Sequence, residues 1–294
     1  DEYPNAYPLQ ISKCKNVKLI GRNNAKIIAC DEPKTSTLSE GIEKPMQGGE
    51  WGWRAITALF VYCDNVEVSN IRFEQSHMWT VSFEKCMNGY VHDLDFYTTI
   101  LNADGVDLRS GCKNFKIENI TGFTYDDAVA LSCSKYKAYK NEEYPLNDSI
   151  IYPSEITRRM NTDLSDDELA IENVQVKNVC TSGACRCVIC YSSYGGIVRN
   201  VLYDSIENKK TDIEGIDKNH IALFKIYGEN YVDNAIKNIR VNNIKCRVGY
   251  PVQVLVKTED VYINKVLCVA NKEMDIKYPE GIKITNRIDW IEPE

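Results

Sequence analysis

Three aspartates in two short segments are the residues of this sequence best suited to acid–base chemistry. Asp104 lies in the segment Asn102-Ala103-Asp104-Gly105-Val106-Asp107, and the adjacent pair Asp126 and Asp127 begins 22 residues after Asp104. If this interval is one coil of a stacked fold, the three carboxyl groups lie on neighbouring rungs, about 4.8 Å apart. Like charges at that distance repel, so at least one carboxyl group keeps its proton beside an ionised neighbour. Hydrolysis of a glycosidic bond needs such an acid and such a carboxylate.

A recurring phrase supports the idea of stacked coils. It begins with an Asn, which is followed by an apolar residue, any residue, a second apolar residue and any residue. A second polar residue and a further apolar residue complete it. Clear copies begin at Asn65, Asn114, Asn173 and Asn238, and weaker ones at Asn16, Asn88, Asn200 and Asp260. Alternation is the period of a half-buried strand, and Asn suits the turns because it tolerates left-handed φ. The sequence therefore predicts an all-β fold, a single right-handed parallel β-helix (solenoid) that spans residues 1–294 as one domain.

Two insertions interrupt the repeat, at about 31–54 and about 135–170. The first is rich in Pro, Gly, Ser, Thr and Glu and contains Trp51 and Trp53, and the second is mostly polar. Long insertions in a compact fold are usually functional, and those of a solenoid tend to leave from the binding face. Trp51 and Trp53 are therefore predicted to bind substrate by stacking on a sugar ring.

Cysteines recur at one position of the repeat rather than scattering as disulfide partners would. Cys14, Cys63, Cys86 and Cys112 each precede the opening Asn by two residues. Small apolar thiols at such a position predict a reduced ladder inside the coil. Reduced cysteines favour an intracellular or anaerobic setting, whereas a polysaccharide substrate favours a secreted protein, so the compartment stays open.

The composition of the chain limits the kinds of partner that it can bind. The net charge of -7 argues against a nucleic-acid surface, and no apolar run approaches the roughly 18 residues of a membrane span. Cys185, Cys187 and Cys190 lack the pair of CxxC motifs that is typical of zinc sites, and the histidines are scattered. We therefore expect a carbohydrate partner, no nucleic acid, no membrane, no metal and no other cofactor, and we leave the oligomeric state open.

The segment from Asn102 to Ser132 resembles glycoside hydrolase family 28, the polygalacturonases. That family has an Asn-Thr-Asp motif and an Asp-Asp motif about one coil later, which correspond to Asn102-Ala103-Asp104 and to Asp126-Asp127. The resemblance is clear over residues 60–133 and looser elsewhere. It implies that Asp126 is the general acid, that Asp104 and Asp127 activate water, and that Asn102 binds substrate. It also implies inversion at the anomeric carbon, for which a wider carboxyl separation leaves room for water.

The later motifs of the family are only partly present. Arg186 stands where the His of Gly-His-Gly is expected, and Leu223-Phe224-Lys225 keeps only the Lys of Arg-Ile-Lys. Arg186 and Lys225 are retained as candidate substrate-binding residues. The partial loss of basic groups bears on whether the substrate is a galacturonate more than on whether it is hydrolysed.

Other interpretations remain beside the hydrolase. A non-catalytic carbohydrate-binding β-helix, of the tailspike or adhesin kind, fits the loss of Gly-His-Gly, although retention of all three aspartates argues against it. A polysaccharide lyase or epimerase would need calcium ligands beside a basic residue, and in the sequence only Arg109 is close. Taken alone, Asp107 is expected to be a turn residue that bonds its own backbone.

Overall fold

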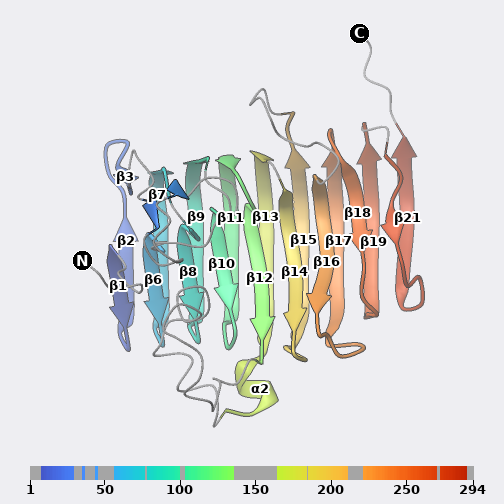
Figure 1. Cartoon of the computed structure of the whole chain (residues 1–294), viewed down its shortest axis with the longest axis horizontal. Coiled ribbons are helices and arrows are strands. Elements are labelled where there is room, and N and C mark those ends of the chain that lie inside the picture. The colour runs from blue at the N-terminus through green and yellow to red at the C-terminus, as the bar shows by residue number, and fades with distance from the viewer. Residues whose placement is uncertain are drawn as a thin grey trace.

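The computed structural model describes residues 8–29, 35–36, 44–45, 56–76, 78–99, 103–135, 164–183, 185–210, 221–269 and 272–289. Over these ranges the chain forms a parallel β-helix whose strands lie side by side along one axis (Figure 1). The predicted fold class is therefore confirmed. Most of both predicted insertions lies outside the described residues, and the extent of the single domain stays a prediction.

Two long parallel sheets make up the stack. The first contains, in spatial order, β1 (Leu9–Ser12), β6 (Ala58–Val61), β8 (Val81–Glu84), β10 (Val106–Arg109), β12 (Val129–Ser134), β14 (Arg186–Ser193), β16 (Ala222–Glu229), β18 (Tyr250–Val254) and β20 (Asp275–Ile276). The second contains β2 (Lys15–Ile20), β7 (Asp64–Glu74), β9 (Met87–Thr98), β11 (Lys113–Thr124), β13 (Ile171–Gly183), β15 (Val198–Asn208), β17 (Ile236–Cys246), β19 (Glu259–Cys268) and β21 (Ile282–Asp289).

A few short elements lie off these two paths. β3 (Lys26–Ile28) pairs with β7, and β4 (Thr35–Ser36) pairs with β5 (Lys44–Pro45) in an antiparallel ladder. Ser165 is the N-cap of the helix α2 (Asp166–Leu169), and its hydroxyl accepts a hydrogen bond from the amide of Glu168. Among the described helices, none has the length and apolar character that crossing a bilayer requires.

Neighbouring coils pair in register, so apolar residues meet apolar residues inside the stack. Val106 of β10 lies opposite Val81 of β8 and Val129 of β12. The rings of Phe60 and Phe83 stack in the core with centroids 5.0 Å apart. Burying such a side chain contributes roughly 1.5–3 kcal/mol, which makes the core the main source of stability. The residues between these apolar positions point outward, as the period of two requires.

The recurring Asn residues form the predicted corners. Asn65, Asn114 and Asn173 have φ values of 58°, 59° and 58°, in the left-handed region. Their side chains bond from coil to coil: the amide of Asn114 donates to Asn88 at 3.1 Å, and that of Asn173 donates to Asn114 at 3.1 Å. The second polar residue of the phrase takes the same conformation and bends each long strand near its middle. The prediction that Asn forms the turns is confirmed, and the structure shows in addition that these turns stack into an Asn ladder.

The cysteine ladder is confirmed at three of four positions. Cys63, Cys86 and Cys112 are buried with free thiols, whereas Cys14 is also free but exposed. The prediction for Cys14 is wrong because it lies on the first coil of the described stack. There, β1 and β2 pair on one side only, with β6 and β7. A residue in the core position of an end coil lacks the second neighbour that would cover it.

We expect the Asn ladder to contribute measurably to stability. Asn173 donates to Asn114 and accepts from Asn200 at 3.2 Å. Asn173→Ala removes both bonds and places alanine at left-handed φ, so urea unfolding should show a loss of about 1–3 kcal/mol. Asn173→Gly loses the bonds but tolerates the backbone, and should therefore lose less. Equal losses in the two variants would contradict the backbone part of this account.

Candidate active site

The strand register places Asp104, Asp127 and Arg186 at the same position of three successive coils. Each of the three precedes by two residues a valine of the aligned row Val106, Val129 and Val188. The predicted coil of 22 residues pairs Asp104 with Asp126. The observed coil is one residue longer, so Asp127 takes that place, and Asp126 stands immediately before it.

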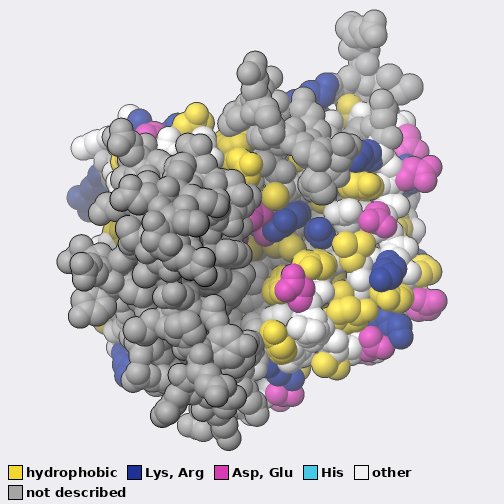
Figure 2. All heavy atoms as spheres, viewed as in Figure 1, with side chains coloured by type: hydrophobic (Ala, Val, Ile, Leu, Met, Phe, Trp, Pro, Cys, Tyr) yellow, Lys and Arg dark blue, Asp and Glu magenta, His cyan; other side chains and the backbone are white. Residues whose placement is uncertain are grey.

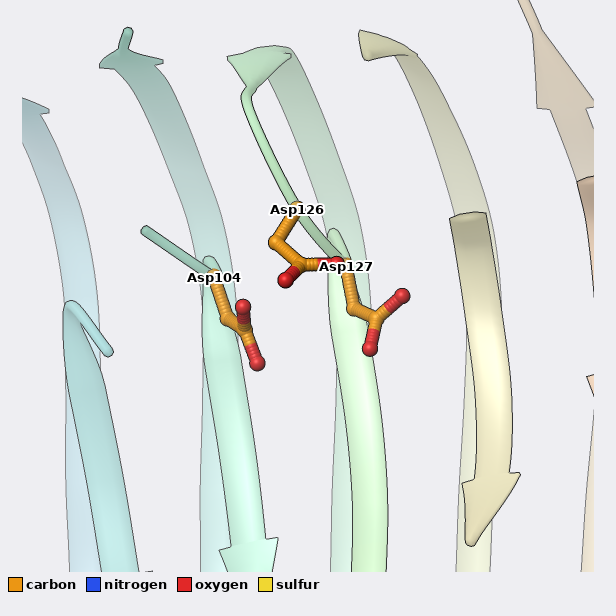
Figure 3. A group of neighbouring side chains, drawn as sticks. All are labelled: Asp104, Asp126 and Asp127. Carbon is orange, nitrogen blue, oxygen red and sulfur yellow. The ribbon is translucent and has the colours of Figure 1, made fainter. Parts of the chain in front are cut away.

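The three aspartates meet, as Figure 3 shows, with the carboxyl group of Asp126 between the ribbons that carry the other two. One carboxylate oxygen of each lies within 4.8 Å of an oxygen of both others. All three are nearly buried, with exposed fractions of 5% for Asp104, 8% for Asp126 and 4% for Asp127. Burying three negative charges together is unfavourable unless protons or a cation compensate them.

Arg186 supplies a positive charge to this cluster. Its Nε and Nη2 donate to the two carboxylate oxygens of Asp127, at 2.5 and 2.9 Å, and Nη2 lies 2.8 Å from Oδ1 of Asp126. Burial alone would lower the pKa of Arg186, but Asp127 and Asp126 raise it well above its ordinary value. The forked guanidinium is therefore a permanent cation within the cluster, and it offsets part of the rise in the pKa of Asp127.

The carboxyl groups differ in how firmly they hold a proton. Burial raises the pKa of Asp104 well above its ordinary value, and the charges of Asp107, Asp126 and Asp127 add to this effect. Burial also raises the pKa of Asp127, to about 6, although Arg186 opposes the rise. The carboxyl groups of Asp104 and Asp127 therefore differ in how strongly their surroundings favour the protonated form, a difference that acid–base chemistry uses.

Asp104, Asp126 and Asp127 are also close enough together to be considered as ligands of a metal ion. Among the described residues, no other group of three His, Cys, Asp or Glu side chains is as compact. Divalent cations prefer several oxygen ligands at short range. Here the guanidinium of Arg186 already bridges Asp126 and Asp127, so a divalent cation would have to displace it. The contacts of Arg186 therefore argue against a divalent cation in this cluster.

Asp107 interacts electrostatically with this cluster, which the sequence does not predict. Instead of a turn it occupies the middle of β10, fully buried, and neither of its carboxylate oxygens has a hydrogen-bond partner among the described residues. The turn interpretation is wrong because Val106 and Leu108 alternate with it as core residues. That alternation was the available signal: it directs Asp107 to the outer face, the face of the aspartates.

Of the other predicted substrate-binding residues, only Lys225 can be placed beside Arg186. It points outward from β16 and is half-buried, with Nζ 5.1 Å from the ring centroid of Tyr227. Burial and the charge of Arg186 lower the pKa of Lys225. Asn102, Trp51 and Trp53 lie outside the described residues, and their roles stay predictions.

The outer face next to the cluster also carries two tyrosines. Tyr191 of β14 and Tyr227 of β16 pair in register, are partly exposed, and have ring centroids 5.6 Å apart. In Figure 2, basic side chains and an acidic one emerge beside the grey atoms, with open mixed surface over the C-terminal half of the first sheet. In the sequence, the alternation of inward and outward residues along β14 and β16 was the signal that could have placed Tyr191 and Tyr227 on the outer face.

A thiol also contacts the cluster. Burial, followed by the charge of Asp126, raises the pKa of Cys185 to about 12, and its side chain is hydrogen-bonded to Asp126. Cys185 therefore stays a neutral thiol at neutral pH, and its proton is available to the Asp126 carboxylate.

We expect Arg186→Met to destabilise the protein by about 3–5 kcal/mol near neutral pH, because it leaves two buried carboxylates without their cation. The folded-state pKa of Asp127, about 6, already exceeds the ordinary value of about 3.9. Its proton therefore stabilises the fold at low pH, and that contribution is lost as pH rises through about 6. Without Arg186 the pKa rises further, so the melting temperature should fall more steeply between about pH 5 and pH 9.

A matched control for this measurement is Arg240→Met. Arg240 lies on β17 of the second sheet and pairs with exposed Asp260 at 2.7 Å. An exposed pair of this kind is worth less than about 1 kcal/mol. Equal losses and equal pH slopes in the two variants would contradict the role of Arg186 as a buried counter-charge.

Comparison with known proteins supports the fold of this chain and does not identify its family. No family model matches the sequence, and no curated protein sequence matches it. A tailspike protein of E. coli bacteriophage HK620 has a similar structure, with a TM-score of 0.59 at 10% identity, over 94% of this chain and 48% of that chain. At that identity the likeness shows a shared parallel β-helix.

Two glycan-degrading enzymes are more distant in shape. An exopolygalacturonase from Thermotoga maritima has a TM-score of 0.48 at 16% identity, over 85% of this chain and 58% of that chain. An endo-xylogalacturonan hydrolase from Aspergillus tubingensis has a TM-score of 0.42 at 12% identity, over 97% of this chain and 77% of that chain. This chain spans about half the length of the tailspike and of the exopolygalacturonase, at 48% and 58%.

Proposed function

We propose that this protein is a glycoside hydrolase that cleaves a glycosidic bond in a poly- or oligosaccharide, with Asp104, Asp126 and Asp127 as catalytic residues. The observation that carries the proposal is the meeting of these three buried carboxyl groups within 4.8 Å of one another. They are also the residues at which the sequence resembles the polygalacturonases. The resemblance and the contact between side chains separated in sequence support the same chemistry.

The contacts of Arg186 favour a different division of labour from the one that the resemblance implies. The resemblance gives the acid role to Asp126, yet Asp126 is ion-paired with Arg186, which also donates to both oxygens of Asp127. Asp104 has the carboxyl group whose pKa lies well above its ordinary value. We therefore assign proton donation to Asp104, and we assign the orientation and deprotonation of water to Asp126 and Asp127.

The stereochemical outcome depends on the separation of the carboxyl groups and on the hydrogen bonds that they already accept. Inverting enzymes usually have carboxyl groups about 6.5–9.5 Å apart, and retaining enzymes about 5–5.5 Å. The separation of at most 4.8 Å between the nearest oxygens is closer than expected for inversion. However, Arg186 occupies both oxygens of Asp127, which weakens it as a nucleophile toward carbon. This favours attack by water, and inversion remains our proposal.

The substrate is expected to lie over the open surface beside the cluster. Tyr191 and Tyr227 offer ring faces of the kind that pack against sugars, and Lys225 offers a positive charge close to them. The charge of Arg186 is engaged by two carboxylates. It therefore contributes less to holding an acidic sugar than the family motif would.

Two other functions make different predictions. A polysaccharide lyase needs a neutral base, and Arg186, whose pKa is raised well above its ordinary value, cannot accept a proton. A lyase would release an unsaturated sugar that absorbs in the ultraviolet. A non-catalytic glycan-binding β-helix is compatible with the fold, which by itself does not determine function. It would bind glycan without releasing reducing ends.

We expect reducing-sugar release from at least one member of a panel of pectic, hemicellulosic and host-type glycans. Asp104→Asn and Asp127→Asn should each lose about 10²- to 10⁴-fold in kcat, the usual contribution of general acid–base catalysis. On a substrate whose leaving group needs no proton, Asp104→Asn should recover while Asp127→Asn stays slow. Proton NMR of the first product should show an inverted anomeric configuration.

The control for these variants is Asp204→Asn, at a partly exposed aspartate on β15 of the second sheet, which should keep full activity. Recovery of Asp126→Asn instead of Asp104→Asn would return the acid role to Asp126. If the wild-type protein binds a glycan and hydrolyses none of the panel, the hydrolase proposal fails and the binding module replaces it.

The pH dependence provides a separate test. Water can be deprotonated only when Asp127 is ionised, so kcat/KM should rise with pH through about 6. It should fall again at higher pH, where Asp104 loses its proton. An acid limb near the ordinary aspartate value of about 3.9 would argue against Asp127 as the base. The measurement is a pH profile of kcat/KM in a constant-ionic-strength buffer series.

A further inference from the structure

Asp104 and Asp107 form a second pair of carboxyl groups, separate from the two that Arg186 binds. Asp107 is fully buried and Asp104 nearly so. Of the charges around Asp104, that of Asp107 acts on it most strongly. Among the residues that the structure describes, no donor bonds either oxygen of Asp107 or Oδ1 of Asp104. Two ionised carboxylates in this arrangement would be buried close together, with three of their four oxygens lacking such a donor.

The groups that face Asp107 do not resolve this conflict. On β8 it lies opposite Ser82, and on β12 opposite Ala130. Ser82 is buried, and within the described part of the chain its hydroxyl makes no hydrogen bond to Asp107 or to any other group. Glu84, farther along β8, is a further buried carboxyl group, and neither of its oxygens has a hydrogen-bond partner among the described residues.

The positive charges nearby are directed elsewhere. Arg109, on the same strand, attracts Asp107 and lowers its pKa, but its guanidinium stacks on the ring of Trp79 at 4.0 Å. Lys85, at the end of β8, lies over the ring of Tyr62 at 5.6 Å, and burial lowers its pKa. Arg186 donates to Asp127 and forms an ion pair with Asp126.

We propose that Asp107 is a positioning residue that shares a single proton with Asp104 and so keeps Asp104 ready to donate. One proton between the two side chains supplies the missing donor and removes one of two adjacent buried charges. The O–H of one carboxyl group donates to an oxygen of the other, a short charge-assisted bond of the stronger kind. The role of this proton in catalysis rests on the proposed function, whereas the sharing of the proton between Asp104 and Asp107 does not.

The electrostatics of Asp107 point the same way. Burial raises the pKa of Asp107 to about 8, although Arg109 and the hydrogen bond with Asp104 oppose the rise. Because the two groups interact strongly, they titrate as a pair, and the proton belongs to both. The pair should therefore keep one proton through neutral pH and lose it only at about pH 8 or above.

In the proposed reaction, Asp104 gives this proton to the glycosidic oxygen as the bond to the anomeric carbon breaks. The attacking water loses a proton to the carboxylates of Asp126 and Asp127, so the proton count of the site is unchanged. While Asp104 is ionised, Asp107 stands beside it without a donor. That unfavourable state favours prompt recovery of a proton by the pair.

The first experiment reads the proton directly and needs no substrate. Difference infrared spectra between low and high pH should show a carboxylic-acid C=O band in the wild-type protein at pH 7, which disappears only above about pH 8. At pH 7 the band should be lost or strongly reduced in Asp107→Asn and equally in Asp104→Asn, because each variant removes half of the pair. Asp204→Asn on the second sheet is the control and should keep the band.

The second experiment is the pH profile of kcat/KM. In Asp107→Asn the neighbouring charge is gone and an amide can donate to ionised Asp104, so the alkaline limb should move at least one pH unit lower. The acid limb, which reports Asp127, should stay in place. A merely structural role for Asp107 would lower activity at all pH values without moving either limb.

The outcomes separate the two proposals. If the band is present but no glycan is hydrolysed, the shared proton stands and the hydrolase proposal fails. If glycan is hydrolysed but the wild-type band is absent at pH 7, or is retained in both single variants, the shared proton is overturned. Should Asp107→Asn fail to fold, the wild-type spectrum and Asp104→Asn still decide the question.

Discussion

Parallel pairing in register is the constraint on which the rest of this structure depends. Because each coil lies directly on the one before it, every position of the repeat becomes a column along the axis. A column of apolar residues makes the core, and the stacked rings of Phe60 and Phe83 belong to one. A column of Asn makes the outer ladder, since the amide both donates and accepts. The fold selects residues that pair favourably with copies of themselves.

The candidate site is where this rule is broken. A column that reads Asp104, Asp127 and Arg186 brings two like charges together before a cation follows, and Asp126 and Asp107 add two more carboxyl groups. Arg186 compensates the pair that it contacts, and in our proposal a shared proton compensates the other. Local conflict within an otherwise consistent structure is typical of functional sites. In the proposed hydrolase, this conflict separates the acid from the base.

The shared fold with a phage tailspike is compatible with several functions, because the β-helix supplies a rigid frame rather than a reaction. What the frame contributes is the constant rise between coils. It holds the carboxyl groups of different coils at a spacing set by backbone hydrogen bonds rather than by flexible loops. The chemistry then depends on the few side chains that the repeat does not determine.

The sequence alone determined the fold class, because the period of the Asn phrase and the alternation around it are local properties. It also determined that Asp104 and the pair Asp126 and Asp127 lie on neighbouring coils. Only the tertiary structure decided which of them share a counter-ion. Arg186 lies 59 residues after Asp127 in the chain yet donates to it, across a stretch whose length hides the register.

Burial was the other property that the sequence could not supply. Asp107 was expected in a turn and is a fully buried strand residue, and Cys14 was expected in the core and is exposed. Both errors have one physical reason. A pattern specifies the side of a strand on which a residue lies, whereas its burial and its pKa depend on what the neighbouring coils place against it.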